Sequence, residues 1–139
     1  MYRTILVAFD GSEHARAALE RALYLAEAHG ATLHVIGVVD RRVRDEPGLS
    51  SAELATIEAE ESYAEVMAEV ERAAADTPVD ADCRICHGIP DEEILEYADE
   101  IDADVIFLGL HGDHDTHAGG VGKGVKARCD REVRTVQGD

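Results

Sequence analysis

The residues best suited to chemistry gather in one stretch near the end of the chain, from Gly109 to Gly124. Six of its sixteen residues are glycine, and glycine leaves backbone amides unshielded, so that several N–H groups can point at one oxyanion. The apolar run Val105–Leu108 before it predicts a buried strand, and the residues after it can continue as a helix. Because a strand, a glycine loop and a helix start are the parts of a phosphate-binding site, we expect a phosphate here.

The charge of this region differs from that of the whole chain. Both lysines of the sequence, Lys123 and Lys126, lie in the stretch or just after it, and three arginines follow at positions 128, 131 and 134, although the formal net charge of the chain is -17. A basic segment in so acidic a protein favours an anionic ligand. The alternative is that these residues form the solvated face of a short final helix. The prediction of a phosphate site therefore depends on the spacing of the glycines rather than on charge.

Three histidines in the same stretch offer a different chemistry. His111, His114 and His117 alternate with Asp113 and Asp115, and imidazole and carboxylate groups this close together can bind a divalent transition-metal ion. The alternative, which we favour, is that they are solvated loop residues, because strong zinc sites usually take their ligands from separated segments.

A further pattern, Cys83-Arg84-Ile85-Cys86-His87, matches the C-x-x-C-H pattern of covalent haem attachment. Five residues are a weak pattern, and these fall in a predicted strand, so we expect two small cysteines of the core or the sheet face instead. With Cys129 the chain has three cysteines, and this odd number argues against a disulfide framework.

The positions of these residues depend on alternating strands and helices. Apolar runs predict five strands, and amphipathic stripes predict helices between them. Ser12 is placed to cap the first helix and Gly30 to end it. The strands are expected at 4–9, 33–39, 82–87, 104–108 and 132–137, and the helices at 13–29, 52–75, 90–101 and directly after the glycine stretch.

Strands that alternate with helices predict a single α/β domain, residues 1–139, with a parallel sheet covered on both faces. The doubly wound strand order is 2-1-3-4-5 or its relative 3-2-1-4-5, and ligands bind outside the carboxyl ends of the strands where the winding reverses. If strands one and four are neighbours, Asp10 and Gly109 face one crevice, with Val38 at its rim. We therefore expect Asp10 and the glycine loop to form one site.

The composition of the chain limits where the protein can be located and which partners it can bind. Strand-like sequence follows Met1 at once, and no apolar run approaches the roughly 20 residues that span a bilayer, so we expect a soluble, cytoplasmic protein. The net charge of -17 argues against nucleic acid or an anionic membrane as a partner.

Four segments of the chain resemble the universal stress protein family. They are Ile5-Leu6-Val7-Ala8-Phe9-Asp10-Gly11-Ser12, Val38-Val39-Asp40, Gly88-Ile89-Pro90, and the run from Asp102-Ala103-Asp104-Val105-Ile106 to Gly109-Leu110-His111-Gly112. The resemblance covers nearly the whole chain. It implies a flavodoxin-like, three-layer α/β/α fold of the adenine nucleotide alpha hydrolase type, with a five-stranded parallel sheet in the order 3-2-1-4-5.

The resemblance also implies an adenine nucleotide site. Members that bind ATP carry glycine, two residues, glycine, nine residues, glycine, and then serine or threonine. Gly109, Gly112 and Gly122 match the three glycines, His111 belongs to the motif, and Lys123 replaces the hydroxyl residue.

The resemblance assigns a role to each part of this site. Asp10 would accept from the ribose hydroxyls or the adenine side, the backbone of Val38 would read the adenine edge, and the glycine loop would hold the phosphates. The ammonium of Lys123 would pair with the phosphate oxygens as a point charge. Mg²⁺ would accompany ATP, with Asp113 or Asp115 nearby.

A second alignment of the loop stays open. If the last helix keeps its usual family length, Gly119-Gly120-Val121 matches the family's Gly-Ser-Val, and Val121, Val125 and Cys129 face inward. Gly122 and Gly124 then fall in the first helical turns, where each costs roughly 0.5–1 kcal/mol relative to alanine. In both alignments the family's hydroxyl residue is missing.

The function implied by the resemblance is that of a stress-response regulatory module that binds ATP or AMP. Hydrolysis would be slow at most, because no general base is evident beyond Asp10. Related proteins dimerise edge to edge through an apolar final strand, and a homodimer is expected here although Glu132–Gln137 offers only two aliphatic residues. The alternative is an interaction protein that binds no nucleotide and acts through its dimer surface.

The acidic composition predicts a protein of a halophilic archaeon. Thirty acidic residues face thirteen basic ones, and like charges destabilise a compact chain unless salt screens them. We predict that the melting temperature rises from dilute buffer to molar KCl, as followed by circular dichroism. A melting temperature that stays flat over this range would contradict the prediction.

Overall fold

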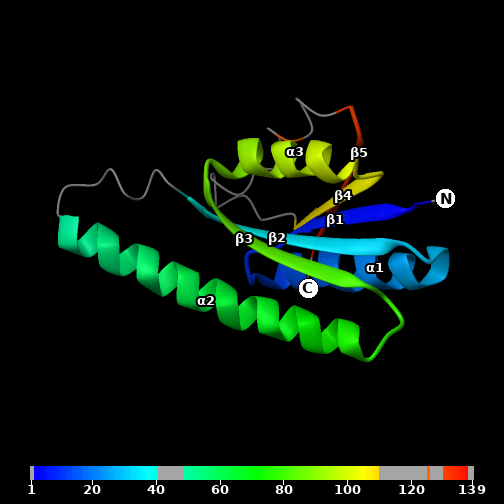
Figure 1. Ribbon diagram of the computed structural model, residues 1–139, viewed down its shortest axis with the longest axis horizontal. Helices are drawn as coiled ribbons and strands as arrows, with labels where there is room; N and C mark the ends of the chain where they lie inside the picture. The colour runs from blue at the N-terminus through cyan, green and yellow to red at the C-terminus, as the bar shows by residue number, and fades with distance from the viewer. Residues whose placement is uncertain (1, 41–48, 110–124, 126–129, 138–139) are drawn as a thin grey trace.

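The computed structural model describes residues 2–40, 49–109, 125 and 130–137. Five parallel strands form one sheet in the order β3-β2-β1-β4-β5, as expected. Helices α1 and α2 cover one face and α3 covers the other, which gives three layers (Figure 1). In chain order the elements are β1 Thr4–Ala8, α1 Glu13–His29, β2 Thr32–Asp40, α2 Leu49–Ala75, β3 Ala81–Gly88, α3 Pro90–Ile101, β4 Val105–Gly109 and β5 Glu132–Val136.

The centre of the sheet is buried on both faces, which explains the unbroken apolar runs of β1 and β4. In β1, Ile5 and Val7 pack with α1 and α2, whereas Leu6 between them packs with α3. In β4, the side chains of Val105–Leu108 are all buried. Because these two strands carry alternate side chains into both layers, they fix the position of the helices on each side.

Local signals set the ends of α1 and α3 where the sequence predicts them, whereas α2 begins three residues before its predicted start. The Ser12 hydroxyl accepts from the Ala15 N–H at 3.1 Å and caps α1. Gly30 ends α1 with a φ of 67°, and its N–H donates to Ala26. Pro90 opens α3 with three acidic residues in the first turn, where the helix dipole favours them.

Strand β1 ends one residue earlier than the sequence predicts. It closes at Ala8 rather than Phe9, although the N–H of Phe9 still donates to the Ile36 carbonyl at 2.9 Å. The chain leaves the sheet here because Gly11 turns it, with a φ of 83°, toward α1. Asp10 therefore lies beyond the end of the strand.

At the opposite end of the sheet, Asp104 joins β1 to β4. Its carboxylate accepts from the N–H groups of Arg3 at 2.7 Å and Thr4 at 2.9 Å, and its own N–H donates to the Thr4 carbonyl at 2.8 Å. The two backbone hydrogen bonds to the carboxylate hold the pKa of Asp104 below its ordinary value of 3.8.

In the part of the chain that the structure describes, no helix is long and apolar enough to cross a bilayer.

We predict that Asp104→Ala lowers the free energy of unfolding by about 1–2 kcal/mol at pH 7 through the loss of these hydrogen bonds. Since the pKa is lower in the folded protein, the contribution is present above the pKa of the unfolded chain and is lost as the pH falls through the folded pKa. Urea titrations should show the difference from wild type shrinking below about pH 4. Asp76→Ala, an exposed position beyond α2, is the control, and equal urea midpoints for Asp104→Ala and wild type at pH 7 would contradict the prediction.

Candidate functional site

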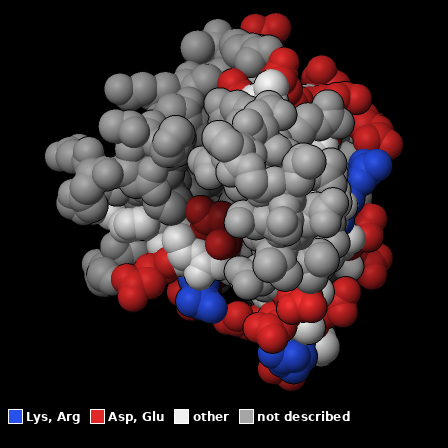
Figure 2. Space-filling view, turned by 90° about the vertical axis from the view of Figure 1, so that its left-hand side faces the viewer, with Lys and Arg blue, Asp and Glu red and all other residues white. Residues whose placement is uncertain are grey.

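The structure brings Asp10, Val38 and Gly109 to the same edge of the sheet. In the register of the strands, Ala8 lies beside both Ile36 and Leu108, so Val38 on β2 and Gly109 on β4 each lie within two residues of the level at which β1 ends. Strand β2 itself continues beside β3 as far as Asp40. This edge lies on the left of Figure 1, and Figure 2 looks straight onto it. On the described part of this face, acidic side chains are widely spread and basic ones are few.

The backbone of Val38 faces the side of β2 on which β1 lies. The Ile36 carbonyl accepts from the N–H of Phe9, the residue that follows β1. Backbone groups alternate in direction along a strand, so those of Val38 point the same way as those of Ile36. Since β1 ends at Ala8, it does not extend beside Val38. The N–H and carbonyl of Val38 are thus directed past the end of β1, where an edge of a base can pair with them.

Tyr63 of α2 contacts this same backbone. Its hydroxyl donates to the Val38 carbonyl at 3.1 Å. Its ring lies against Gly37, where a Cβ atom would come within 2.6 Å of the ring carbon Cδ1 and 2.8 Å of Cε1. The sequence places Tyr63 only in the apolar stripe of α2. The signal that would have found it is a glycine inside an apolar strand, which often marks the close approach of another group.

Asp10 is held by the turn that starts α1. One carboxylate oxygen, Oδ1, accepts from the Ser12 N–H at 2.9 Å, and Gly11 packs under Val66 of α2. The residue is exposed. A carboxylate has several acceptor positions, and hydroxyl groups are suitable donors to them.

Gly109 places the start of the glycine stretch against α1. A Cβ atom at this position would lie 2.6 Å from the backbone nitrogen of Ala15 and 2.8 Å from the carbonyl carbon of His14. Only glycine lets the end of β4 come this close to the first turn of the helix.

The rest of the predicted loop lies outside the described residues, apart from Val125. This residue is helical and fully buried in the core beneath α3. Both loop alignments therefore stay predictions. The same holds for every loop residue to which the sequence analysis gives a role: His111, Gly112, Asp113, His114, Asp115, His117, Gly119, Gly120, Gly122 and Lys123.

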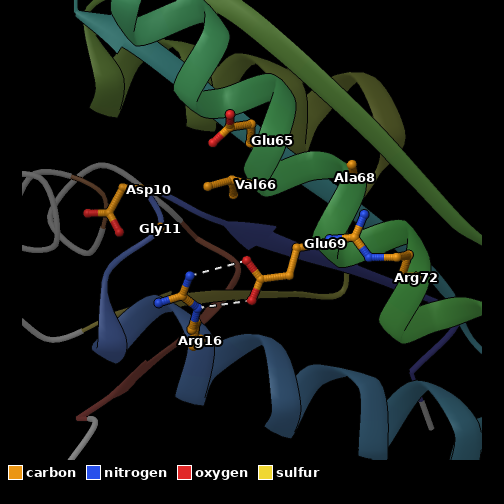
Figure 3. Close-up of a pocket in the computed structure, with 8 residues that line it drawn as sticks. All are labelled: Asp10, Gly11, Arg16, Glu65, Val66, Ala68, Glu69 and Arg72. Atoms are coloured by element: carbon orange, nitrogen blue, oxygen red, sulfur yellow. Dashed lines mark hydrogen bonds and ion pairs between the residues drawn. The ribbon is translucent and has the colours of Figure 1, made fainter.

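A cavity of about 600 Å³ opens beside Asp10, between α1 and α2 (Figure 3). Arg16 of α1 spans it with two hydrogen bonds of 3.1 Å to the carboxylate of Glu69 on α2. The hydrogen bond from Arg16 lowers the pKa of Glu69. The volume falls within the range of small-molecule sites, and the lining residues are Asp10, Gly11, Arg16, Glu65, Val66, Ala68, Glu69 and Arg72.

The two cysteines of β3 are strand residues, as the sequence predicts. Cys83 packs into the core beneath α1 and α2, and Cys86 into the core beneath α3. Burial raises the pKa of each thiol to about 11. Thiols on opposite faces of a sheet do not meet at one haem, which removes the geometric basis for haem attachment. Among the residues that the structure places, no three histidine, cysteine or acidic side chains are grouped to hold a metal ion.

Comparison with known proteins decides the family. The Universal stress protein family profile matches residues 1–127. The chain belongs to this family. A universal stress protein of Thermus aquaticus, encoded 3′ of a sulfhydrylase gene, is 38% identical over 116 residues, which cover 81% of this chain and 80% of the relative.

Two solved structures of the family share the fold. A universal stress protein in complex with cAMP has a TM-score of 0.75 and 24% identity, over 99% of this chain and 99% of that one. The universal stress protein of Archaeoglobus fulgidus in complex with dAMP has a TM-score of 0.68 and 22% identity, over 97% of this chain and 98% of that one. At these identities the likeness shows a common fold.

We predict that Gly109→Ala lowers the free energy of unfolding by about 2–3 kcal/mol, because the new methyl group meets backbone atoms of α1 that cannot yield. Gly88→Ala is the matched control, since Gly88 also ends a strand but faces the flexible side chain of Glu93. It should cost less than about 1 kcal/mol. Denaturant titrations that give both variants the same stability would show that the contact between β4 and α1 is not tight.

Proposed function

We propose that this universal stress protein binds an adenine nucleotide, ATP or AMP, at the carboxyl ends of β1, β2 and β4. The observation that carries the proposal is the convergence of three groups on one edge of the sheet: the carboxylate of Asp10, the backbone of Val38 and the first residue of the glycine stretch, Gly109. The relatives solved with cAMP and dAMP add support, since both ligands are adenine nucleotides.

Each group has a role in the proposed complex. The N–H and carbonyl of Val38 pair with the acceptor and donor on the edge of adenine, and Asp10 accepts from the ribose hydroxyls. The glycine stretch holds the phosphates through its backbone amides, from Gly109, Gly112, Gly119, Gly120 and Gly122 together with His111.

The charge of the protein makes phosphate binding depend on cations. The chain carries a net charge of -17. Asp10 lies at the proposed site, and Glu65 lines the cavity beside Asp10. Lys123 pairs with the phosphates in this proposal, and Mg²⁺ offsets the remaining negative charge of ATP. High salt screens the repulsion further, so we propose that the protein works in a salt-rich, halophilic cytoplasm.

The output of the proposed module is regulatory. Hydrolysis is slow at most, and a homodimer joined through β5 passes the signal to a partner. The position of β5 at one edge of the sheet supports such a dimer, because an edge strand can pair with a second copy of itself. The second candidate, an interaction protein that binds no nucleotide, would also use strand β5 as its dimer surface.

We predict that isothermal titration in molar KCl detects binding of Mg-ATP and AMP to the wild-type protein. Asp10→Asn should weaken both by about 10-fold or more, because a charge-assisted hydrogen bond to the ribose is lost. The amide oxygen of asparagine can still accept from Ser12, so the turn is kept. Lys123→Ala should weaken ATP more than AMP.

Asp76→Asn, beyond the far end of α2, is the control and should bind like wild type. A wild-type protein that binds neither nucleotide would contradict the proposal and favour the interaction protein.

A further inference from the structure

The carbonyl that would read the base is already a hydrogen-bond acceptor within the protein. Val38 directs its backbone past the end of β1, and the Tyr63 hydroxyl donates to its carbonyl at 3.1 Å. A base that donates to this oxygen therefore has to compete with the Tyr63 hydroxyl, which already donates to it.

Tyr63 is held where it contacts Val38. Its ring packs on Gly37, the residue before Val38, and occupies the space that a side chain at position 37 would need. The Cε methyl of Met67, one helical turn further along α2, fills the rest of that space and lies 2.8 Å from the same point. Tyr63 is itself partly buried against the core of this face. The hydroxyl is therefore fixed by packing and does not swing freely into water.

We propose that Tyr63 determines base specificity by competing with the 6-amino group of adenine for the Val38 carbonyl, provided that the crevice holds the base as proposed above. A carbonyl oxygen has two lone pairs, but one of them faces a donor that the packing of α2 keeps in place. The 6-amino group has to share the oxygen or displace the hydroxyl. Either way, adenine gains less from Val38 than it would from a carbonyl bonded only to water.

The consequence is a site that distinguishes purines weakly at position 6. A purine without a donor there loses little at Val38, because the tyrosine continues to satisfy the carbonyl. Removal of the hydroxyl should sharpen the preference for adenine, because the 6-amino group of the ligand then donates to this oxygen without competition from Tyr63.

The test compares AMP with purine riboside 5′-monophosphate, which has hydrogen in place of the 6-amino group. Isothermal titration in molar KCl is carried out on wild type and on Tyr63→Phe, which keeps the ring on Gly37. We expect Tyr63→Phe to bind AMP about 2- to 10-fold more tightly, the range that one neutral hydrogen bond supplies. Binding of purine riboside 5′-monophosphate should change less than about 2-fold.

Tyr97→Phe is the matched control. The hydroxyl of Tyr97 also forms a hydrogen bond within the protein, with the Nδ1 atom of His34 at 3.1 Å, but Tyr97 lies on α3 at the other face of the sheet. The variant should leave the ratio of the two affinities unchanged. Urea titrations of both variants establish that each one folds.

A second measurement reports on the hydroxyl directly. In protein labelled with ¹³C at the tyrosine rings, the signal that disappears in Tyr63→Phe belongs to Tyr63. AMP should move this signal more than purine riboside 5′-monophosphate does, and should leave the Tyr97 signal in place.

The outcomes separate this inference from the proposed function. If wild type binds AMP and Tyr63→Phe leaves the affinity ratio unchanged or weakens AMP, Tyr63 is no competitor and the nucleotide site stands. If neither protein binds either nucleotide, the site and the role of Tyr63 both fall. If only Tyr63→Phe binds AMP measurably, competition is strong and both are supported.

Discussion

Burial of the central strands on both faces fixes the positions of β1 and β4 in the sheet, and the remaining features depend on this constraint. Strands β1 and β4 carry apolar side chains into both helical layers, so neither strand can shift without disturbing the packing on each side. Their carboxyl ends are therefore fixed at a common edge. Asp10, Val38 and Gly109 lie at this edge because the packing of the core fixes where these strands end.

Most of the fold could be predicted from the sequence, because its causes are local. The apolar runs of β1 and β4, the Ser12 cap and the end of α1 at Gly30 each depend on a few neighbouring residues. The strand order follows from the family resemblance together with the rules for doubly wound sheets. The early end of β1 was missed because periodicity cannot locate the residue at which a strand leaves its sheet.

The site was harder to predict, because its described contacts join residues far apart in the chain. Asp10, Val38 and Gly109 could be placed at one edge from topology alone. The hydrogen bond of Tyr63 to Val38 and the pairing of Arg16 with Glu69 depend on how α2 lies across the sheet. An amphipathic stripe shows which face of a helix is buried, but it does not show what that face touches. The role of the glycine stretch past Gly109 stays a prediction, because those residues lie outside the described part of the chain.

The alternation of β3 has a consequence for oxidative chemistry. Two thiols three residues apart would form a redox couple on a helix or in a tight turn, but in β3 the sheet itself separates Cys83 from Cys86. With a pKa of about 11 at each sulfur, little thiolate is present at neutral pH to react with peroxide. The sheet thus keeps the two sulfurs apart, and both thiols are partly packed into the core on either side of it.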